Sequence, residues 1–320
     1  MSTDLSLLNP TQRRFANVFG DQFEVDAPLS RNTSTRVGGN AEMLVTIRNT
    51  EELKTAVEMA YSTNVRYFIL GGGSNVLVAD EGIAGLVIIN RARNVTFRSA
   101  GASIICRAES GANLSTLARQ CNSKGLGGLE WAIGVPGTLG GAVVGNSGAF
   151  GGDMSDNVVM VEVWEPGKGI RNYSIDELAY NYRTSTFKKD HGKLKARRII
   201  LAAELRLKPE PAKALLARAE AFNEKRKNSQ PGGASTGSMF KNPPNYYAGY
   251  LIEAAGLKGY RNGQASISEK HANFFINHGG ATAEDIRGLV AEAWHQVREK
   301  FHVEMELEVE LVGDWDFESG

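Results

Sequence analysis

The sequence predicts an α+β protein with a strand-rich part up to about residue 207 and a separate α+β domain after it. Short runs rich in β-branched and aromatic residues, typical of strands, outnumber helical patterns in the first part. Pro209 and Pro211 then mark a boundary, because proline interrupts both helices and sheets. The chain of 320 residues is long enough for two or three domains, each with its own core.

Composition places the chain among ordinary globular proteins and narrows its partners. Hydrophobic residues make up 42% and charged residues 22%, and 36 basic residues balance 36 acidic ones. This balance argues against a nucleic-acid partner, because proteins that bind nucleic acids usually carry an excess of basic residues. No apolar stretch suits a signal peptide or a membrane span, and Cys106 and Cys121 are too few for a disulfide framework or a zinc site. We therefore expect a cytoplasmic protein with reduced thiols, no bound metal, no membrane partner and no obligate protein partner.

The first elements should form a strand, a helix and a second strand that ends in a glycine turn. Residues 1–30 are typical of a loosely helical lead-in, and Met43–Ile47 is expected to be a strand. Thr50 is expected to cap a helix, since apolar residues follow it at positions spaced by four. Tyr67–Leu70 is the next expected strand.

A glycine turn follows this strand directly, formed by Gly71, Gly72, Gly73, Ser74 and Asn75. Val76–Val78 comes next and is typical of a strand, whereas the glycine turn of a Rossmann unit opens a helix. The spacing is not G-x-G-x-x-G, and the Walker A pattern is absent from the chain. Two interpretations remain open, a nest of backbone N–H donors for a pyrophosphate and a tight hairpin turn.

The rest of the first part continues as strands with one clear helix. The helix is expected around Leu114–Cys121 and should end at Gly125, while Ser174 and Glu177 form a capping box. The expected strands are Gly85–Asn90, Ser103–Ala108, Asn157–Glu165 and Arg198–Leu207.

The stretch Ile133–Ala149 contains six glycines and few bulky side chains. Such a density of glycine costs backbone entropy and is warranted only where something approaches the main chain closely. Its leucine and valines distinguish it from a flexible linker. We interpret it as a wall of main chain whose N–H groups face an anion or a planar ligand. A glycine-rich loop between two domains is the alternative.

The part after Pro211 is expected to be an α+β domain of roughly a hundred residues, a common domain size. Its last helix should begin at a capping box of Thr282 and Asp285, and its last strand should be Met305–Val312. The other expected elements are helices over Ala212–Lys227 and residues 246–255, the second ended by Gly256, and short strands over Ala265–Ser268 and Phe274–Asn277.

Two groups in this domain suggest chemistry. Ser238 lies in Gly237–Pro243 without a G-x-S-x-G elbow, so it does not resemble a hydrolase nucleophile. Lys241 could lower the pKa of the Ser238 hydroxyl or hold a phosphate. Glu308 either points inward from the last strand or belongs to a solvent-facing row with Glu304, Glu306 and Glu310. The residues alone leave both alternatives open.

Six motifs, in this order and spacing, resemble the UDP-N-acetylenolpyruvoylglucosamine reductase family. These flavoenzymes make UDP-N-acetylmuramate for peptidoglycan in cell wall biosynthesis. The motifs are Leu70–Asn75, Ile133–Gly148, Tyr182–Phe187, Gly237–Pro243, Ser268–Phe274 and Glu306–Val309, and the resemblance runs from Asn32 to Gly313. The chain looks like the shorter family variant. It has no long insertion between Arg183 and Ala212 and so lacks the loop whose tyrosine covers the substrate in the other variant.

The resemblance implies an FAD-binding fold of the PCMH/vanillyl-alcohol-oxidase type with two α+β subdomains, followed by a C-terminal α+β substrate-binding domain. It places these three parts at residues 1–90, 91–208 and 209–320. The FAD pyrophosphate is expected at Gly71–Asn75. The flavin and ribityl contacts are expected from a second segment, made up of Pro136, Gly137, Thr138, Leu139, Gly140, Gly141 and Ala142.

The resemblance also implies the reaction and its residues. NADPH would reduce FAD, and a hydride would pass from flavin N5 to the methylene carbon of UDP-N-acetylglucosamine enolpyruvate. The residues at the family's catalytic positions are Arg183, Ser238 and Glu308. The guanidinium and a protonated carboxyl would stabilise the enolate, and the serine would protonate it. Lys227, Asn242 and His271 fall where the family contacts the UDP-sugar, and Lys241 is expected to join them.

Two other functions remain open. One is another FAD oxidoreductase of the same fold, although neither glycine cluster contains the His or Cys that often tethers a flavin. The other is a non-catalytic protein that binds a nucleotide sugar. The presence of Arg183, Ser238 and Glu308 argues against it, because a binding protein needs no proton donor.

Overall fold

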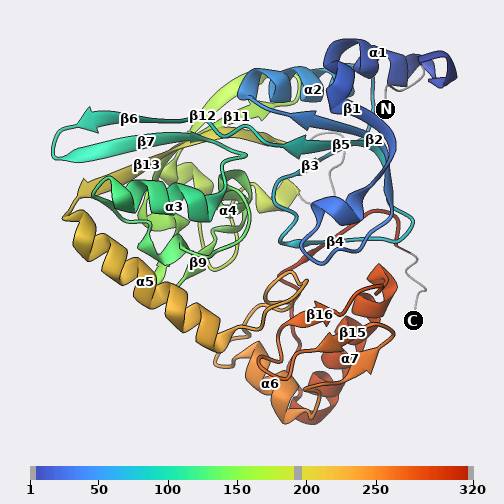
Figure 1. The fold of residues 1–320 in the computed structure, drawn as a ribbon, viewed down its shortest axis with the longest axis vertical. Coiled ribbons are helices and arrows are strands. Elements are labelled where there is room, and N and C mark those ends of the chain that lie inside the picture. The colour runs from blue at the N-terminus through green and yellow to red at the C-terminus, as the bar shows by residue number, and fades with distance from the viewer. Residues whose placement is uncertain (1–4, 191–196, 316–320) are drawn as a thin grey trace. The chain divides into compact units, whose positions relative to one another are not determined.

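The structure is a computed structural model that describes residues 5–190 and 197–315 (Figure 1). These residues form two compact units. The first contains residues 5–25, 43–72, 85–190 and 197–226, and the second contains residues 26–42, 73–84 and 227–315. The chain therefore passes between the units inside the first glycine cluster, after Gly72, and near the end of a helix, after Arg226. The expected division into two FAD-binding subdomains, residues 1–90 and 91–208, and a substrate-binding domain, residues 209–320, stays a prediction.

A small sheet and two helices make up one layer of the first unit. Its strand order is β1-β2-β5-β3, and β3 runs parallel to β5. The helices bury their apolar faces in one hydrophobic core with this sheet. The elements are α1 (Pro10–Phe19), β1 (Phe23–Pro28), β2 (Asn40–Ile47), α2 (Thr50–Ser62), β3 (Tyr67–Leu70) and β5 (Ile83–Asn90).

A larger antiparallel sheet forms the centre of the first unit, with strand order β12-β11-β13-β7-β6 and β8 paired to β13. Helices α3 (Leu114–Ser123) and α4 (Leu139–Gly145) cover one of its faces, and α2 lies on the other side (Figure 1). The strands are β6 (Val95–Ala100), β7 (Ser103–Glu109), β8 (Leu126–Gly127), β11 (Val158–Glu165), β12 (Gly169–Ser174) and β13 (Ile199–Pro209).

The strand β13 is the most central element of this sheet. Ile199 and Leu201 lie in the core that contains α2, whereas Ala203, Leu205 and Leu207 lie in the core that contains α3 and α4. A strand covered on both faces needs a nearly continuous apolar sequence, which β13 has. It therefore provides a rigid base for the segments that begin or end beside it.

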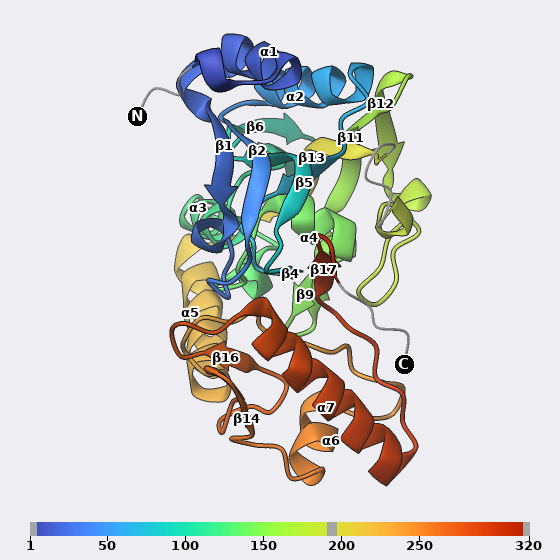
Figure 2. The ribbon, with the colours of Figure 1, turned by 90° about the vertical axis from the view of Figure 1, so that its right-hand side faces the viewer.

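The second unit has a three-stranded antiparallel sheet, β14-β15-β16, with α6 and the long α7 in the same core (Figure 2). Its last strand, β17, pairs in parallel with β4, which comes from the segment after the first glycine cluster. The helix α5 (Ala212–Ser229) leads into this unit. The elements are β4 (Val76–Val78), α6 (Ala248–Ala254), β14 (Arg261–Asn262), β15 (Ala265–Ile267), β16 (Phe275–Asn277), α7 (Ala283–Phe301) and β17 (Glu310–Val312).

Short elements complete the fold. A two-stranded ribbon consists of β9 (Gly148–Ala149) and β10 (Gly152–Asp153). The 3-10 helices are η1 (Leu5–Leu7), η2 (Gly20–Gln22), η3 (Leu29–Asn32), η4 (Glu130–Ala132), η5 (Met154–Asp156), η6 (Ile175–Leu178) and η7 (Lys188–Asp190). Among the described residues, no helix is long and apolar enough to cross a bilayer.

The expected strand–helix–strand order before the first glycine cluster is confirmed, as is the capping box of Thr282 and Asp285. The expected cap at Thr50 is wrong. Asn49 is the N-cap of α2, and its side chain accepts a hydrogen bond of 2.9 Å from the Glu52 N–H. Both residue types suit an N-cap, so the sequence did not separate them.

Thr50 instead binds a buried carboxylate on β7. Its hydroxyl donates to Glu109 Oε1 at 2.8 Å, and its N–H donates to the same oxygen at 3.2 Å. The other carboxylate oxygen accepts from the Asn94 N–H at 2.8 Å. Glu109 thus ties the start of α2 to the central sheet through two hydrogen bonds from Thr50 and accepts a third from Asn94.

Two further expectations are corrected. The glycine-rich stretch includes a helix, α4, that its pattern did not indicate; Leu139 and Val143 are buried on its core face. In the expected strand Met305–Val312, only Glu310–Val312 is a strand. Glu308 lies at a bend before it and is half-buried like Glu310, whereas Glu304 and Glu306 are exposed.

We predict that Glu109→Gln lowers the free energy of unfolding by about 1–3 kcal/mol, because the amide nitrogen of glutamine faces donors that a carboxylate satisfies. Chemical denaturation measures this change. Glu58→Gln, on the exposed face of α2, is the matched control and should change stability by less than about 0.5 kcal/mol. Equal stability of the two variants would contradict the role given to Glu109.

Candidate functional site

The two glycine clusters meet in the first unit. A Cβ on Gly72 would lie 2.8 Å from the Cα of Gly137, and a Cβ on Gly71 would lie 2.3 Å from Oγ1 of Thr138. Such distances exclude any side chain at either glycine. Arg91 Nη1 donates to the Gly71 carbonyl at 2.9 Å and fixes the first cluster from another direction. Two segments expected to bind FAD therefore form one continuous main-chain surface.

The start of α4 is pinned to a neighbouring loop. The N–H of Leu139 donates to the Ala112 carbonyl and the N–H of Gly140 to the Ser110 carbonyl, both at 2.8 Å. The Leu114 N–H donates to the Gly137 carbonyl at 3.1 Å. The amides of Leu139 and Gly140 are thus bound within the protein. A cofactor contact of either residue would have to use another atom.

The glycines of α4 differ in what surrounds them. A Cβ on Gly140 would lie 2.9 Å from the Cβ of Ser110, so packing requires glycine there. A Cβ on Gly141 or Gly145 would meet only one atom within 4 Å, at 3.8 and 3.9 Å. Glycine inside a helix costs about 1 kcal/mol relative to alanine, and the protein's own packing does not explain that cost at these two positions. A flat ligand lying against α4 would explain it, so the surface fits an FAD.

Arg183 lies at the tip of a tight turn. Asn181 and Thr184 exchange two backbone hydrogen bonds of 3.1 and 3.2 Å, which leaves Tyr182 and Arg183 as the turn residues. Arg183 has a φ of 53°, in the left-handed region that a non-glycine residue occupies at a cost of about 1 kcal/mol or more. Its Nη2 donates to the Gly148 carbonyl on β9 at 3.1 Å.

The turn is attached to the end of α4. Asn146 is the left-handed C-cap of this helix, and its Nδ2 donates to the Asn181 carbonyl at 3.2 Å. Beyond Arg183, the Ser185 hydroxyl donates to the Val144 carbonyl at 2.6 Å. The half-buried Arg183 is therefore fixed relative to the glycine helix, inside one unit. Neither Asn146 nor Ser185 was predicted to have a role in the site, although asparagine after a glycine-rich helix is a recognisable C-cap signal.

Ser238 and Glu308 lie on neighbouring segments of the second unit. The Glu308 N–H donates to the carbonyl of Met239, the residue after Ser238, at 2.9 Å. The Lys241 N–H donates to the Glu306 carbonyl at 2.8 Å, and Phe240 bridges Leu307. This short antiparallel pairing brings the backbone segments that carry Ser238 and Glu308 next to each other. Both side chains are half-buried.

Asn273, for which no site role was predicted, holds the segment that follows Ser238. Asn273 Oδ1 accepts from the Phe240 N–H at 2.9 Å, and its Nδ2 donates to the Phe240 carbonyl at 2.8 Å. Asn273 is 3% exposed. Its carbonyl also accepts from the Met239 N–H at 2.8 Å. Asn273 belongs to the Ser268–Phe274 motif, but its residue type alone did not indicate that it would bind the backbone of Phe240.

The second half of the first glycine cluster supports the Glu308 segment. Asn75 Nδ2 donates to the Glu308 carbonyl at 3.1 Å, and the Asn75 carbonyl accepts from the Glu310 N–H at 3.0 Å. Gly73 is packed so closely that its Cβ would lie 2.0 Å from the Asn32 carbonyl oxygen. Gly73 and Asn75 therefore have structural roles in the second unit. Their contacts to FAD, like that of Ser74, stay a prediction.

The residues expected to contact the UDP-sugar also lie in the second unit, in different surroundings. Lys241 Nζ forms an ion pair of 2.9 Å with Glu306. Asn242 Oδ1 accepts from the Ala248 N–H at 3.0 Å, at the start of α6. Lys227 is exposed, and its carbonyl accepts from Lys270 Nζ at 2.6 Å.

His271 is half-buried, with its ring 4.9 Å from that of Phe274. Burial lowers the pKa of His271 below its ordinary value of 6.5, so the ring is neutral at pH 7. Its Nδ1 accepts from the Asn273 N–H at 3.2 Å. The proton of the neutral ring then belongs to Nε2, which can donate to a ligand.

Comparison with known proteins identifies the family. Residues 41–171 match the FAD binding domain, and residues 229–312 match the C-terminal domain of UDP-N-acetylenolpyruvoylglucosamine reductase. The reductase of this name from Caldanaerobacter subterraneus subsp. tengcongensis is 40% identical over 292 residues, which cover 91% of this chain and 93% of the relative. The chain belongs to the UDP-N-acetylenolpyruvoylglucosamine reductase family.

Other members agree. The reductase from Rubrobacter xylanophilus is 40% identical over 289 residues, which cover 90% of this chain and 95% of its own. The crystal structure of the family member from Thermus caldophilus matches with a TM-score of 0.73 at 35% identity and covers 90% of this chain and 97% of that one. The predicted fold class, an FAD-binding domain of the PCMH type joined to a C-terminal α+β domain, is confirmed.

The two kinds of glycine in α4 give a prediction. Gly140→Ala should lower the free energy of unfolding of the apoprotein by about 1–3 kcal/mol through its clash with Ser110. Gly141→Ala should leave it unchanged or raise it by up to about 1 kcal/mol, yet weaken FAD binding. Denaturation of the apoprotein and titration with FAD measure the two effects. Undiminished FAD affinity in Gly141→Ala would show that the cofactor does not lie against this family member's α4.

The buried imidazole of His271 gives a pH dependence. Its folded-state pKa lies below the unfolded value of 6.5, so the unfolded chain takes up a proton first as the pH falls through 6.5. Stability should therefore decrease from pH 7 toward pH 5, and the stability of His271→Asn, whose Oδ1 can replace Nδ1 as the acceptor for the Asn273 N–H, should decrease less. Unfolding followed across this range measures the difference. Parallel curves for the two proteins would contradict a neutral, buried ring.

Proposed function

We propose that this protein is an FAD-dependent reductase that converts UDP-N-acetylglucosamine enolpyruvate to UDP-N-acetylmuramate for peptidoglycan, with NADPH as the electron donor. Membership of the family supports the substrate and the cofactor. The observation that carries the proposal is the backbone pairing of residues 239–241 with residues 306–308, which makes the segments of Ser238 and Glu308 neighbours. A hydroxyl and a carboxyl on neighbouring segments suit the delivery of a proton to a carbanion-like centre.

The cofactor would lie against the surface formed by Gly71, Gly72 and the segment 136–142. When bound, FAD supplies hydride chemistry, for which no side chain of the chain is suited. The protein provides a flat main-chain surface there, and the glycines at positions 141 and 145 leave that side of α4 open. Gly73, Ser74 and Asn75 are proposed to complete the pyrophosphate site.

Arg183 is proposed to hold the charge that develops on the substrate. Reduction of the enolpyruvyl double bond at its methylene carbon leaves negative charge on the neighbouring carbon and in the carboxylate. A guanidinium whose backbone is fixed on both sides meets that charge without reorganisation. Removal of one such donor costs about 3–4 kcal/mol of transition-state stabilisation.

Ser238 is proposed to give the final proton, and a protonated Glu308 to share the enolate charge. Lys227, Lys241, Asn242 and His271 are proposed to contact the UDP-sugar. In that role Lys241 would act from its ion pair with Glu306, which directs its ammonium group to a carboxylate. A neutral His271 would act as a hydrogen-bond donor and not as a cation.

A cytoplasmic location is proposed as well, and both cysteines are free thiols. No nucleic acid, membrane or obligate protein partner belongs to this proposal.

The experiment is an anaerobic titration followed by flavin absorbance. The purified protein should be yellow, NADPH should bleach it, and the enolpyruvyl sugar should restore the colour. A colourless protein would refute the FAD proposal, and a reduced protein that the sugar does not reoxidise would refute the substrate proposal.

Within the same experiment, Ser238→Ala should keep reduction by NADPH within about twofold of the unmodified protein. Its turnover of the enolpyruvyl sugar should fall by at least about 10²-fold, because general acid catalysis contributes factors of this size. The reductive half-reaction serves as the internal control. An equal loss in both half-reactions would argue against Ser238 as the proton donor.

A further inference from the structure

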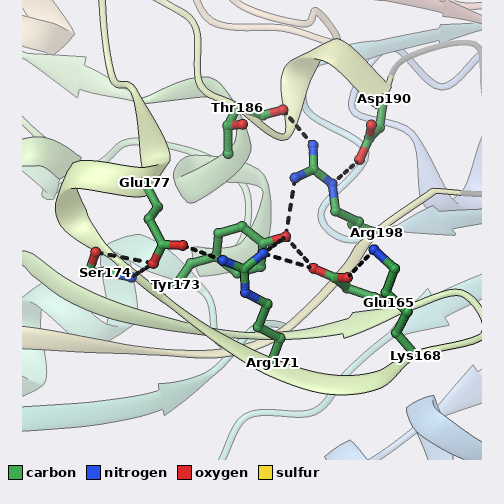
Figure 3. A network of polar contacts seen from close by, with 9 residues as sticks. All are labelled: Glu165, Lys168, Arg171, Tyr173, Ser174, Glu177, Thr186, Asp190 and Arg198. Atoms are coloured by element: carbon green, nitrogen blue, oxygen red, sulfur yellow. Dashed lines mark hydrogen bonds and ion pairs between the residues drawn. The ribbon is translucent and has the colours of Figure 1, made fainter.

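A partly buried network of charged and hydroxyl groups lies within the first unit, away from both glycine clusters in the sequence (Figure 3). Arg198, just before β13, is at its centre. Its Nε donates to Asp190 Oδ2 at 2.6 Å, its Nη2 to the Thr186 carbonyl at 2.8 Å, and its Nη1 to the Tyr173 hydroxyl at 3.3 Å. Every nitrogen of the guanidinium thus has an acceptor.

Two of these acceptors belong to the segment that follows Arg183. Thr186 is three residues after Arg183, and Asp190 ends the 3-10 helix η7 of the same segment. The Thr186 N–H donates in turn to the Leu178 carbonyl at 2.7 Å, on the near side of the turn. Arg198 therefore fastens the segment 186–190 to the beginning of the central strand, while Ser185 fastens it to α4.

The other side of Arg198 rests on buried groups. Its guanidinium lies 5.1 Å from the ring centroid of Phe187 and 5.8 Å from that of Tyr173. The Tyr173 hydroxyl donates to Glu165, which is 5% exposed, and Arg171 Nη1 donates to Tyr173 at 3.4 Å. The hydrogen bond from Tyr173 is the main cause that lowers the pKa of Glu165, so the carboxylate stays charged. The planar guanidinium of Arg198 matches three hydrogen-bond acceptors and two aromatic rings, and a lysine ammonium cannot replace it.

The turn that carries Arg183 has a reason to need such support. A left-handed arginine is a strained conformation, and strain persists only where the surroundings hold it. Before Arg183, the Asn146 side chain binds the Asn181 carbonyl. After Arg183, the Ser185 hydroxyl binds the Val144 carbonyl, and Arg198 binds the Thr186 carbonyl. Loss of the hydrogen bond from Arg198 to the Thr186 carbonyl would release the backbone that follows the turn and let the Arg183 side chain shift.

We propose that Arg198 is a positioning residue for Arg183, acting through the Thr186 carbonyl and Asp190 on the reduction of the enolpyruvyl group. This inference rests on the proposed function of Arg183. Arg198 itself lies in the network and acts on the reaction only by fixing the turn. A displacement on the order of 1 Å at a reacting centre can cost about 10²-fold in rate.

The test compares Arg198→Lys with Arg171→Lys. Both variants remove a guanidinium that binds Tyr173, but Arg171 pairs with Glu165 and Glu177 and not with the segment 186–190. Arg198→Lys should lower kcat by about 10- to 100-fold, with a KM for the enolpyruvyl sugar and a rate of reduction by NADPH within about threefold. Arg171→Lys should keep all three. Thermal unfolding of each variant reports whether it is folded.

A double-mutant cycle decides whether the effect passes through Arg183. In the background of Arg183→Ala, the change Arg198→Lys should slow turnover by no more than about twofold, since the group that it positions is gone. An undiminished effect in that background, or an equal loss in Arg171→Lys, would overturn the proposal. If Arg198→Lys does not fold, Asp190→Asn takes its place and should lower kcat by at least about threefold.

The same experiment separates this inference from the proposed function. If the unmodified protein fails to turn over the enolpyruvyl sugar, the proposed function is wrong. If it turns the sugar over and Arg183→Ala is fully active, the role of Arg183 is wrong and the inference about Arg198 fails with it. If only the Arg198 variants keep full activity, the inference alone is wrong.

Discussion

The placement of Arg183 in the first unit depends on a contact of main chain with main chain at Gly72 and Gly137. No side chain fits between them, so the end of β3 and the approach to α4 have one relative position. The amides of Leu139 and Gly140 then fix the start of α4 on the loop 110–112. The end of α4 holds the Arg183 turn through Asn146 and the Val144 carbonyl. The placement of one cationic side chain thus depends on a series of backbone contacts that begins at two glycines.

In the second unit, backbone contacts between irregular segments hold the candidate residues. Ser238 and Glu308 lie in segments with little regular structure, and backbone hydrogen bonds between residues 239–241 and 306–308 substitute for a sheet. Asn75 holds the Glu308 carbonyl, and β4 pairs with β17 just beyond it. Gly71 and Gly72 of the first glycine cluster thus pack against residues 137 and 138 in the first unit, while the next residues shape the Glu308 segment in the second. A five-residue cluster serves both units because the chain passes between them at Gly72.

Sequence patterns predicted what depends on local composition and missed what depends on distant partners. The strand predicted over Arg198–Leu207 is confirmed as β13, and the α7 cap was predicted because its two residues recognise each other locally. Asn49 and Thr50 have similar intrinsic preferences, so only Glu109 on β7 decided between them. The helix α4 escaped prediction because glycine opposes helices, and only tertiary packing stabilises it. The catalytic candidates came from resemblance to a family. The residues alone did not indicate that the Glu308 N–H would bind the Met239 carbonyl.

Asparagines hold the candidate site segments in both units. Asn75, Asn146 and Asn273 each use a side-chain amide to bind the backbone of a segment that carries a candidate catalytic residue. Segments without regular structure leave backbone N–H and C=O groups unpaired, and an amide can satisfy either kind. A charged side chain would hold the backbone as firmly, but it would also shift the charge states of nearby groups. The proposed chemistry needs a neutral serine, a protonated carboxyl and a cationic guanidinium. Neutral amides fix the backbone without disturbing them, and the ion pair of Arg198 is with Asp190, seven residues after Arg183.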